Sequence, residues 1–315
     1  MILATLLDGT SDGRLVVVSP DRQRYAPAPV ASLREALENW TEAATALAAV
    51  ETFPESIHGA RLTAPLPRTW QWLDGSVYPT HGELMQIAIG HEPIQSERPL
   101  MYQGMSDRFL GPGDDVPLPS EDDGIDFEGE FGVIVDHVPM GTTAAEALDH
   151  IKLLVQINDW SLRAIAGPEM KTGFGWVQAK PACSMAPFAL TPDELGEQWR
   201  GGRVCLDLHI EWNGRPFGHA NGEPMQFGFA ELIAHAARTR DLAAGTVIGS
   251  GTVSNPNYAE VGSSCISELR AIEMIAGGKA TTGFMRFGDR VRMEARAGDG
   301  SAPFGAIDQR VISAS

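Results

Sequence analysis

The sequence predicts an α+β fold that is mostly β, with a small amino-terminal α/β subdomain before a larger β-rich domain. The chain has 315 residues, which exceeds the usual size of a single domain. Strand-length apolar runs separated by glycine and proline turns dominate its downstream part. Helix signals are too few to alternate with these runs, which argues against a parallel βαβ fold.

The first fifty residues predict a hairpin followed by a helix. Residues 2–7 and 14–18 are two β-rich runs, and the turn between them is rich in aspartate and glycine. Ser32 and Glu35 then form a capping-box pattern, which predicts the start of a helix that ends near Val50. Together these elements form the predicted subdomain.

A change in composition marks the predicted domain boundary. Residues 53–68 are rich in proline, glycine, serine and threonine, and proline lacks a backbone donor and restricts the residue before it. We therefore expect a small domain over residues 1–68 and a larger one over residues 69–315.

The larger domain has more strand signals than helix signals. The predicted strands are apolar runs at 131–135, 204–210, 247–248 and 290–293. One predicted helix begins at the capping box of Thr143 and Glu146 and ends near Val155. A second is expected over residues 229–240.

The charge balance excludes several classes of function. The chain carries 24 basic and 41 acidic side chains, a net charge of −17, and has no local basic patch. Such a chain repels phosphate backbones and anionic lipids, so we expect neither nucleic-acid nor membrane partners. The sequence also contains no apolar run of membrane-spanning length and no signal-peptide pattern at its start. We therefore expect a cytoplasmic protein.

The three cysteines do not suggest a disulfide framework or a thiolate zinc site. Cys183, Cys205 and Cys265 are far apart and include no Cys-x-x-Cys pair. We expect them to be reduced core residues. A catalytic thiol at Cys265 is the alternative, although the sequence shows no base positioned to activate it.

An acidic segment carries the strongest chemical signal. Asp126, Glu128 and Glu130 are spaced two apart, so on a β-strand their side chains would lie on one face. Neighbouring carboxylates repel one another unless a cation neutralises them, and Mg²⁺, Mn²⁺ and Ca²⁺ all prefer oxygen ligands. The alternative is the solvated face of an edge strand.

Four motifs in order resemble the fumarylacetoacetate hydrolase family over most of residues 70–290. They are the strand with Glu128 and Glu130, the run from Asn158 to Arg163, Lys180, and the Ser-Gly-Thr-Val-Ser segment at 250–254. The resemblance implies a mixed β-roll catalytic domain, a small amino-terminal domain and a homodimer. It also implies a divalent metal, Mg²⁺ first with Mn²⁺ or Ca²⁺ as alternatives, that chelates a keto acid substrate with adjacent oxygens.

The resemblance assigns roles to individual residues. It implies metal ligands at Glu128, Glu130 and Asp159, and a lysine at Lys180 that supports a developing enolate or carbanion. It implies substrate-binding positions at Tyr102, Arg163 and Thr252. His81 is the candidate base for a hydrolytic water, and Glu268 is its orienting partner. The remaining histidines, His91 among them, are expected to be structural.

The sequence also departs from family members that cleave fumarylacetoacetate. Those enzymes have a further aspartate ligand upstream of the histidine, and neither Asp74 nor Ser76 aligns securely with it. Ala166 replaces a substrate-contacting glutamine, and Gln103 replaces a histidine after Tyr102. A fourth metal ligand and the substrate therefore stay open.

The first functional hypothesis is a metal-dependent hydrolase that cleaves a carbon–carbon bond in a β-diketone acid, such as fumarylacetoacetate or an acylpyruvate. The alternative reactions on the same metal enolate are hydration of a 2-oxo-enoic acid and decarboxylation or tautomerisation of an oxaloacetate-like acid. Because decarboxylation and tautomerisation need no attacking water, the pair of His81 and Glu268 favours hydrolysis over them. A metal- and acid-binding protein without turnover is the second class.

Overall fold

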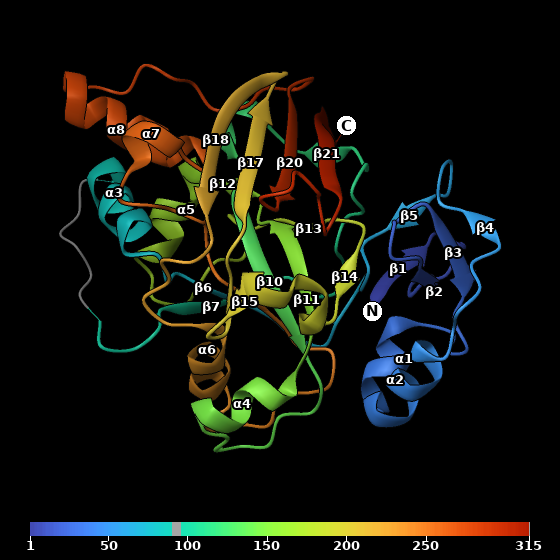
Figure 1. Cartoon of the computed structure of the whole chain (residues 1–315). Coiled ribbons are helices and arrows are strands. Elements are labelled where there is room, and N and C mark those ends of the chain that lie inside the picture. The colour runs from blue at the N-terminus through green and yellow to red at the C-terminus, as the bar shows by residue number, and fades with distance from the viewer. Residues whose placement is uncertain (90–95, 315) are drawn as a thin grey trace.

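The computed structural model describes residues 1–89 and 96–314 and confirms the α+β class (Figure 1). Its largest element is a mixed twelve-stranded sheet with the order β4-β3-β2-β1-β14-β11-β10-β19-β6-β7, in which β5 pairs with β1 and β13 with β11. The strands are β1 (Ile2–Leu6), β2 (Arg14–Val18), β3 (Arg24–Pro27), β4 (Glu55–Ser56), β5 (Leu62–Thr63), β6 (Trp72–Gly75), β7 (Met101–Gly104), β10 (Gly129–Val135), β11 (Ile151–Asn158), β13 (Ser184–Met185), β14 (Ala189–Leu190) and β19 (Val247–Gly249).

A second, five-stranded sheet has the order β18-β17-β20-β21-β8. Its strands are β8 (Val116–Leu118), β17 (Asp207–Trp212), β18 (Arg215–Asn221), β20 (Arg290–Arg296) and β21 (Ala306–Ser313). Two short antiparallel pairs are separate from these sheets: β9 (Ile125–Asp126) with β12 (Ser161–Leu162), and β15 (Trp199–Arg200) with β16 (Arg203–Val204). The predicted strands of the larger domain all contribute to these sheets, although the run at 204–210 is divided between β16 and β17.

The amino-terminal hairpin of β1 and β2 is confirmed, but the predicted single helix is wrong. The chain forms α1 (Leu33–Glu38) and α2 (Trp40–Ala48), which are separated at Asn39 by a non-helical backbone with φ −131° and ψ 46°. The predicted helix start is correct, since the Ser32 hydroxyl accepts the Glu35 backbone N–H at 3.2 Å. Asn39 has a low helix propensity, and a capping residue inside a helical pattern commonly marks a break.

The amino-terminal segment continues the sheet of the larger part of the chain. Strand β1 pairs antiparallel with β14, with Ile2 opposite Leu190 and Leu3 opposite Ala189. Figure 1 shows β1–β5, α1 and α2 as a blue unit beside the main body. Residues 53–68 contain β4 and β5, so this segment belongs to the amino-terminal unit, which shares one sheet with the rest of the chain.

The predicted helix over 143–155 has the correct start but the wrong end. Its capping box forms as expected between Thr143 and Glu146, but α4 (Ala144–His150) ends after seven residues and the chain continues directly as β11. The sequence of β11 is rich in Ile, Leu and Val, and these side chains pack well on a pleated surface buried on both sides. The predicted helix at 229–240 is α6 (Phe229–Ala236).

Four helices have no counterpart among the expected elements. They are α3 (Pro79–Ile89), α5 (Arg163–Met170), α7 (Tyr258–Val261) and α8 (Ile266–Gly277). Gly82 in α3 and Pro168 in α5 interrupt the pattern that would identify a helix from sequence. Figure 1 shows α3, α5 and α8 on the same side of the main body, and α3 packs against α8.

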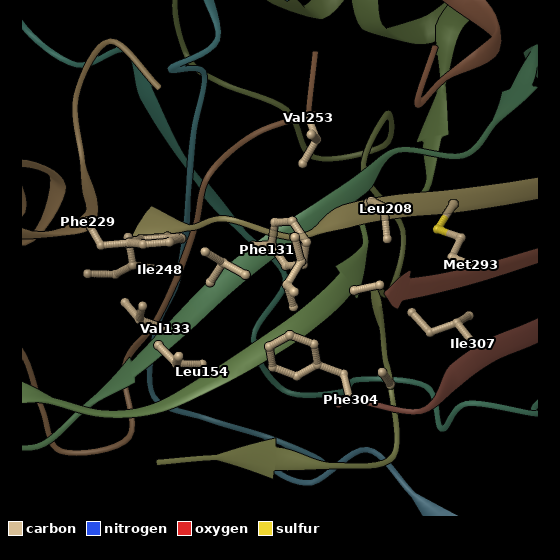
Figure 2. Packing of buried hydrophobic residues seen from close by; sticks show 14 of the residues in the cluster. Phe131, Val133, Leu154, Leu208, Phe229, Ile248, Val253, Met293, Phe304 and Ile307 are labelled. Atoms are coloured by element: carbon tan, nitrogen blue, oxygen red, sulfur yellow. The ribbon is translucent and has the colours of Figure 1, made fainter. Parts of the chain in front are cut away.

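The core joins the two sheets. Phe131 and Val133 of β10 are buried in one cluster with Leu208 of β17 and Met293 of β20 (Figure 2). The ring centroids of Phe131 and Phe304 lie 6.0 Å apart, and both side chains are almost fully buried. Because β10 is covered on both faces, its position relative to neighbouring strands is fixed by apolar packing as well as by backbone hydrogen bonds.

Strand register brings acidic residues to one end of the sheet. Strand β10 pairs with β11, with Gly129 opposite Asn158, and on its other side with β19, with Gly132 opposite Gly249. Strand β19 runs parallel to β6, with Gly249 opposite Asp74. Residues that are far apart in sequence therefore meet where these strands end.

The acid stability of the amino-terminal segment provides a first prediction. The Asp12 carboxylate accepts hydrogen bonds from Arg68 Nε at 2.7 Å and from Arg34 Nη2 at 3.2 Å. These contacts lower the pKa of Asp12 from 3.8 to about 2, and the hydrogen bond from Arg68 has the largest effect. The resulting stabilisation is complete above about pH 4 and is lost as the pH falls toward 2. We expect Asp12→Asn to lower the free energy of unfolding at pH 6 by at most about 1 kcal/mol, since the site is partly exposed.

Urea unfolding of the wild type and Asp12→Asn between pH 3 and pH 6 measures this contribution. The difference in unfolding free energy should shrink as the pH falls, and Arg68→Ala should remove much of the effect of Asp12→Asn in a double-mutant cycle. A difference that is independent of pH would contradict the assignment.

Candidate active site

One large cavity contains most of the predicted site. It has a volume of about 1270 Å³ and is lined by α3, α5, α8 and the ends of several strands. Seven of the predicted site residues line it: His81, Tyr102, Glu128, Glu130, Arg163, Lys180 and Thr252. Asp159 and Glu268 are behind this surface, where Asp159 contacts Lys180 and Glu268 contacts His81.

Three buried carboxylates converge at the end of the central strands. Ligand oxygens of Asp74, Glu130 and Asp159 all lie within 4.8 Å of one another. Burial, together with repulsion from Asp74 and Asp159, raises the pKa of Glu130 well above its ordinary value. Burial and the charge of Asp159 raise the pKa of Asp74 in the same way. Without a cation, the ionised forms of these carboxylates are therefore disfavoured at this site.

This group is suited to a hard divalent cation. Both carboxylate oxygens of Glu130 are buried and have no hydrogen-bond partner among the described residues. An unpaired buried carboxylate is costly, and a cation with oxygen ligands removes that cost. The Gly251 N–H donates to Asp74 Oδ1 at 3.0 Å and orients this carboxylate. A side chain at Gly249 would come within 2.3 Å of the same oxygen, so the aspartate fits only against a glycine.

Asp74 is the site residue that sequence reasoning left open. It stands at the end of the buried run of β6 and reaches Glu130 because β6 lies parallel to β19. No local pattern predicts this parallel pairing, since the two strands are more than 170 residues apart in the chain. The available signal was an aspartate that follows an apolar strand and precedes His81 by seven residues.

Glu128 has a different environment from Glu130. It lies between β9 and β10, and Arg163 Nη2 donates to its Oε1 at 2.6 Å while Lys180 Nζ donates to its Oε2. Although burial alone would raise the pKa of Glu128, the two cations outweigh it and hold the pKa well below the ordinary range. The Glu128 carboxylate is therefore neutralised by the protein itself, whereas that of Glu130 is not.

Lys180 connects Glu128 to Asp159. Its Nζ donates to Asp159 Oδ2 at 2.6 Å and to Glu128, and it lies 5.3 Å from the ring centre of Tyr102. Burial disfavours the charged amine, but Asp159 and Glu128 outweigh burial and raise the pKa of Lys180 above its ordinary value. The lysine therefore stays protonated beside the carboxylate group. Tyr102 Oη also donates to Asp159 Oδ2, at 2.7 Å.

His81 and Glu268 form a buried pair across two helices. His81 Nδ1 lies 2.8 Å from Glu268 Oε1, with the histidine on α3 and the glutamate in the first turn of α8. A carboxylate can only accept, so Nδ1 carries the proton and Nε2 is left as the basic nitrogen. Because His81 lines the cavity and Glu268 is 1% exposed, the pair offers one nitrogen to a bound water.

Arg163 and Thr252, the two other predicted substrate-binding residues, differ in whether their polar groups already have partners in the protein. Arg163 is held by Asp126 Oδ2 at 2.8 Å as well as by Glu128, so its charge is already matched. Thr252 is 2% exposed, lines the cavity, and its hydroxyl has no partner among the described residues. Thr252 therefore has hydrogen-bonding capacity available for a ligand. His91, expected to be structural, lies outside the described residues.

The cysteines are free, and Cys183 and Cys265 are buried as predicted, while Cys205 is only partly buried. The Cys183 thiol donates to Asp159 Oδ1 at 2.8 Å, and burial and Asp159 raise its pKa. Cys183 therefore remains a neutral thiol that helps to hold Asp159.

Known proteins resemble this chain at three levels. Residues 71–312 match the family model described as Fumarylacetoacetate (FAA) hydrolase C-terminal, and residues 1–68 match Fumarylacetoacetase N-terminal domain 2. A 2,4-didehydro-3-deoxy-L-rhamnonate hydrolase from Sphingomonas is 29% identical over 54% of this chain and 61% of its own length. The oxaloacetate tautomerase YisK from Bacillus subtilis is 25% identical over 64% of this chain and 65% of its own length. The aligned regions thus span less than two thirds of these relatives.

A solved structure extends the similarity over the whole chain. Maleylpyruvate hydrolase from Sphingobium, in complex with manganese(II) and pyruvate, superposes with a TM-score of 0.68 at 18% identity and covers 100% of both chains. At this identity the likeness shows a shared fold, and the match of the catalytic family model over residues 71–312 shows the relationship. The chain belongs to the fumarylacetoacetate hydrolase family.

Proposed function

We propose that this protein is a divalent-metal-dependent hydrolase that cleaves a carbon–carbon bond in a β-diketone acid of the fumarylacetoacetate or acylpyruvate type. The observation that carries the proposal is the His81–Glu268 pair, which faces the same cavity as the buried carboxylates. Hydrolysis needs a base that deprotonates the attacking water, and the basic nitrogen of this pair is placed to do so. Mg²⁺ is the proposed metal, and a small keto acid is the proposed partner.

Different residues of the chain carry out different steps of the proposed reaction. A divalent cation bound at Asp74, Glu130 and Asp159 would supply positive charge for adjacent substrate oxygens and polarise the carbonyl under attack. His81 removes a proton from water, and the water oxygen then adds to that carbonyl. Glu268 stabilises the protonated imidazole, which returns the proton to the leaving carbon when the carbon–carbon bond breaks.

Lys180 and Thr252 position the substrate. The Lys180 ammonium is fixed by two carboxylates at the cavity wall, where it stabilises negative charge that develops on the leaving group. The unpartnered hydroxyl of Thr252 is available to a substrate carboxylate or carbonyl oxygen. Arg163, whose charge is already matched, orients Glu128 and thereby Lys180.

Tautomerisation of an oxaloacetate-like acid is the second candidate. It is favoured by the similarity to the Bacillus tautomerase and by the same cluster of carboxylates and lysine, which suits an enolate in either reaction. It differs from hydrolysis in that no bond between carbons breaks and no water is consumed.

A substrate screen with product analysis separates the two candidates. The purified protein with Mg²⁺ or Mn²⁺ is mixed with acylpyruvates, fumarylacetoacetate and oxaloacetate, and loss of the enol absorbance is followed together with mass analysis of products. The hydrolase proposal expects two smaller acids in equal amounts and incorporation of oxygen from labelled water. Loss of absorbance with no change of mass would instead support the tautomerase.

The assembly is a separate prediction. We expect a homodimer, as the family resemblance implies, and light scattering should therefore give a mass of about twice the 33.8 kDa chain. A monomer at micromolar concentration would contradict it. Within the described part of the chain, no helix is both long and apolar enough to cross a bilayer.

A further inference from the structure

A second group of potential metal ligands surrounds the proposed base. The imidazole of His81, the thiol of Cys265 and the carboxylate of Glu268 offer ligand atoms that all lie within 4.8 Å of one another. All three residues are buried, with exposures of 9%, 0% and 1%. Nitrogen, sulfur and oxygen ligands of these types are those that Zn²⁺ takes in three-residue sites with one open position.

The first turn of α8 fixes two of these ligands. Cys265 is the N-cap of the helix, and its sulfur accepts the Glu268 backbone N–H at 3.4 Å. Asp126 accepts the next two free backbone N–H groups, from Ile266 at 2.7 Å and Ser267 at 3.0 Å. The thiol and the carboxylate are therefore held on one turn, and α3 places His81 Nδ1 at 2.8 Å from the Glu268 carboxylate.

The charges of the group match a divalent cation. Burial, with Asp126 and Glu268 nearby, raises the pKa of Cys265, so the free thiol is neutral. Zinc binding would release the thiol proton to solvent, and a thiolate plus a carboxylate would then balance the two positive charges of the ion. Mg²⁺ prefers oxygen ligands only, so it would select Asp74, Glu130 and Asp159 instead.

We propose that Zn²⁺ binds to His81, Cys265 and Glu268 and inhibits the enzyme by occupying its general base. His81 lines the cavity and so gives the ion a route to the two residues behind it. Binding does not depend on which reaction the protein catalyses, whereas inhibition rests on the proposed function.

Cobalt spectroscopy tests binding without any substrate. Co²⁺ replaces Zn²⁺ in such sites, and a cobalt–thiolate bond produces an intense near-ultraviolet charge-transfer band. We expect this band when Co²⁺ is titrated into the Mg²⁺-loaded wild type, its loss in Cys265→Ser, and its retention in Cys183→Ser. Serine is a strong N-cap residue, so Cys265→Ser preserves the helix start.

Cys183→Ser is the matched control because Cys183 is the buried thiol beside the carboxylate group. A band that is absent from the wild type, or that survives in Cys265→Ser, would overturn the proposal. If circular dichroism shows that Cys265→Ser is unfolded, Cys265→Ala provides the same comparison.

Inhibition is measured once a substrate is known. With saturating Mg²⁺, each variant is titrated with Zn²⁺ and compared with its own zinc-free rate. We expect Cys265→Ser to need at least about 10-fold more Zn²⁺ for half inhibition than the wild type, since it lacks one ligand. Equal inhibition of both proteins would place zinc at the carboxylate group and overturn the inhibitory part. A cobalt band in a protein that turns over none of the substrates would contradict the proposed function but not the zinc site.

Discussion

Glu130→Gln is expected to lower the affinity for Mg²⁺ by more than about 100-fold and to remove activity, because it removes a carboxylate whose oxygens have no hydrogen-bond partner among the described residues. Asp159→Asn should have a similar effect. Isothermal titration calorimetry measures the affinity directly. The thermal midpoint provides a second readout, since Mg²⁺ should raise it in the wild type and leave it unchanged in Glu130→Gln.

Glu128→Gln is the informative comparison. If Glu128 is a ligand, as the family resemblance implies, its replacement should weaken Mg²⁺ binding as strongly as Glu130→Gln does. If Asp74 takes that place, Glu128→Gln should weaken binding less, because its charge is already matched by Arg163 and Lys180. Unchanged metal affinity in both Glu130→Gln and Asp159→Asn would show that the site is elsewhere.

The parts of the fold that were predicted correctly are determined locally. The turn between β1 and β2, the caps at Ser32 and Thr143, and the apolar run of β10 each follow from a few adjacent residues. The end of α4 was wrong because a helix cap fixes where a helix starts, while the apolar residues after His150 satisfy either a helix or a strand. Pairing of β11 with β10 decides between them.

The candidate site could be predicted only where motifs carried it. Periodicity placed Glu128 and Glu130 on one face of a continuous strand. The strand is interrupted between β9 and β10, so Glu128 contacts Lys180 while Glu130 has no hydrogen-bond partner among the described residues. The contribution of Asp74 depends on the parallel pairing of β6 with β19, which no local pattern encodes. The closeness of Cys265 to His81 likewise depends on how α3 packs against α8.

Removal of the imidazole at His81 should distinguish hydrolysis from tautomerisation and decarboxylation. We expect His81→Ala to lower kcat for carbon–carbon cleavage by on the order of 10²–10⁴, the usual contribution of a general base. Mg²⁺ affinity should stay nearly unchanged, because His81 is outside the carboxylate group of Asp74, Glu130 and Asp159. Steady-state kinetics and calorimetry measure the two quantities separately.

Glu268→Gln should reduce kcat less than His81→Ala, since it misorients the base without removing it. Tautomerisation of oxaloacetate consumes no water but still transfers a proton at carbon. If the protein catalyses it with the Lys180 ammonium as the proton donor, it should survive His81→Ala. Wild-type turnover of His81→Ala on every accepted substrate would therefore exclude the hydrolase and support the tautomerase. In that case Lys180, and not His81, would be the residue that stabilises the negative charge of the enolate.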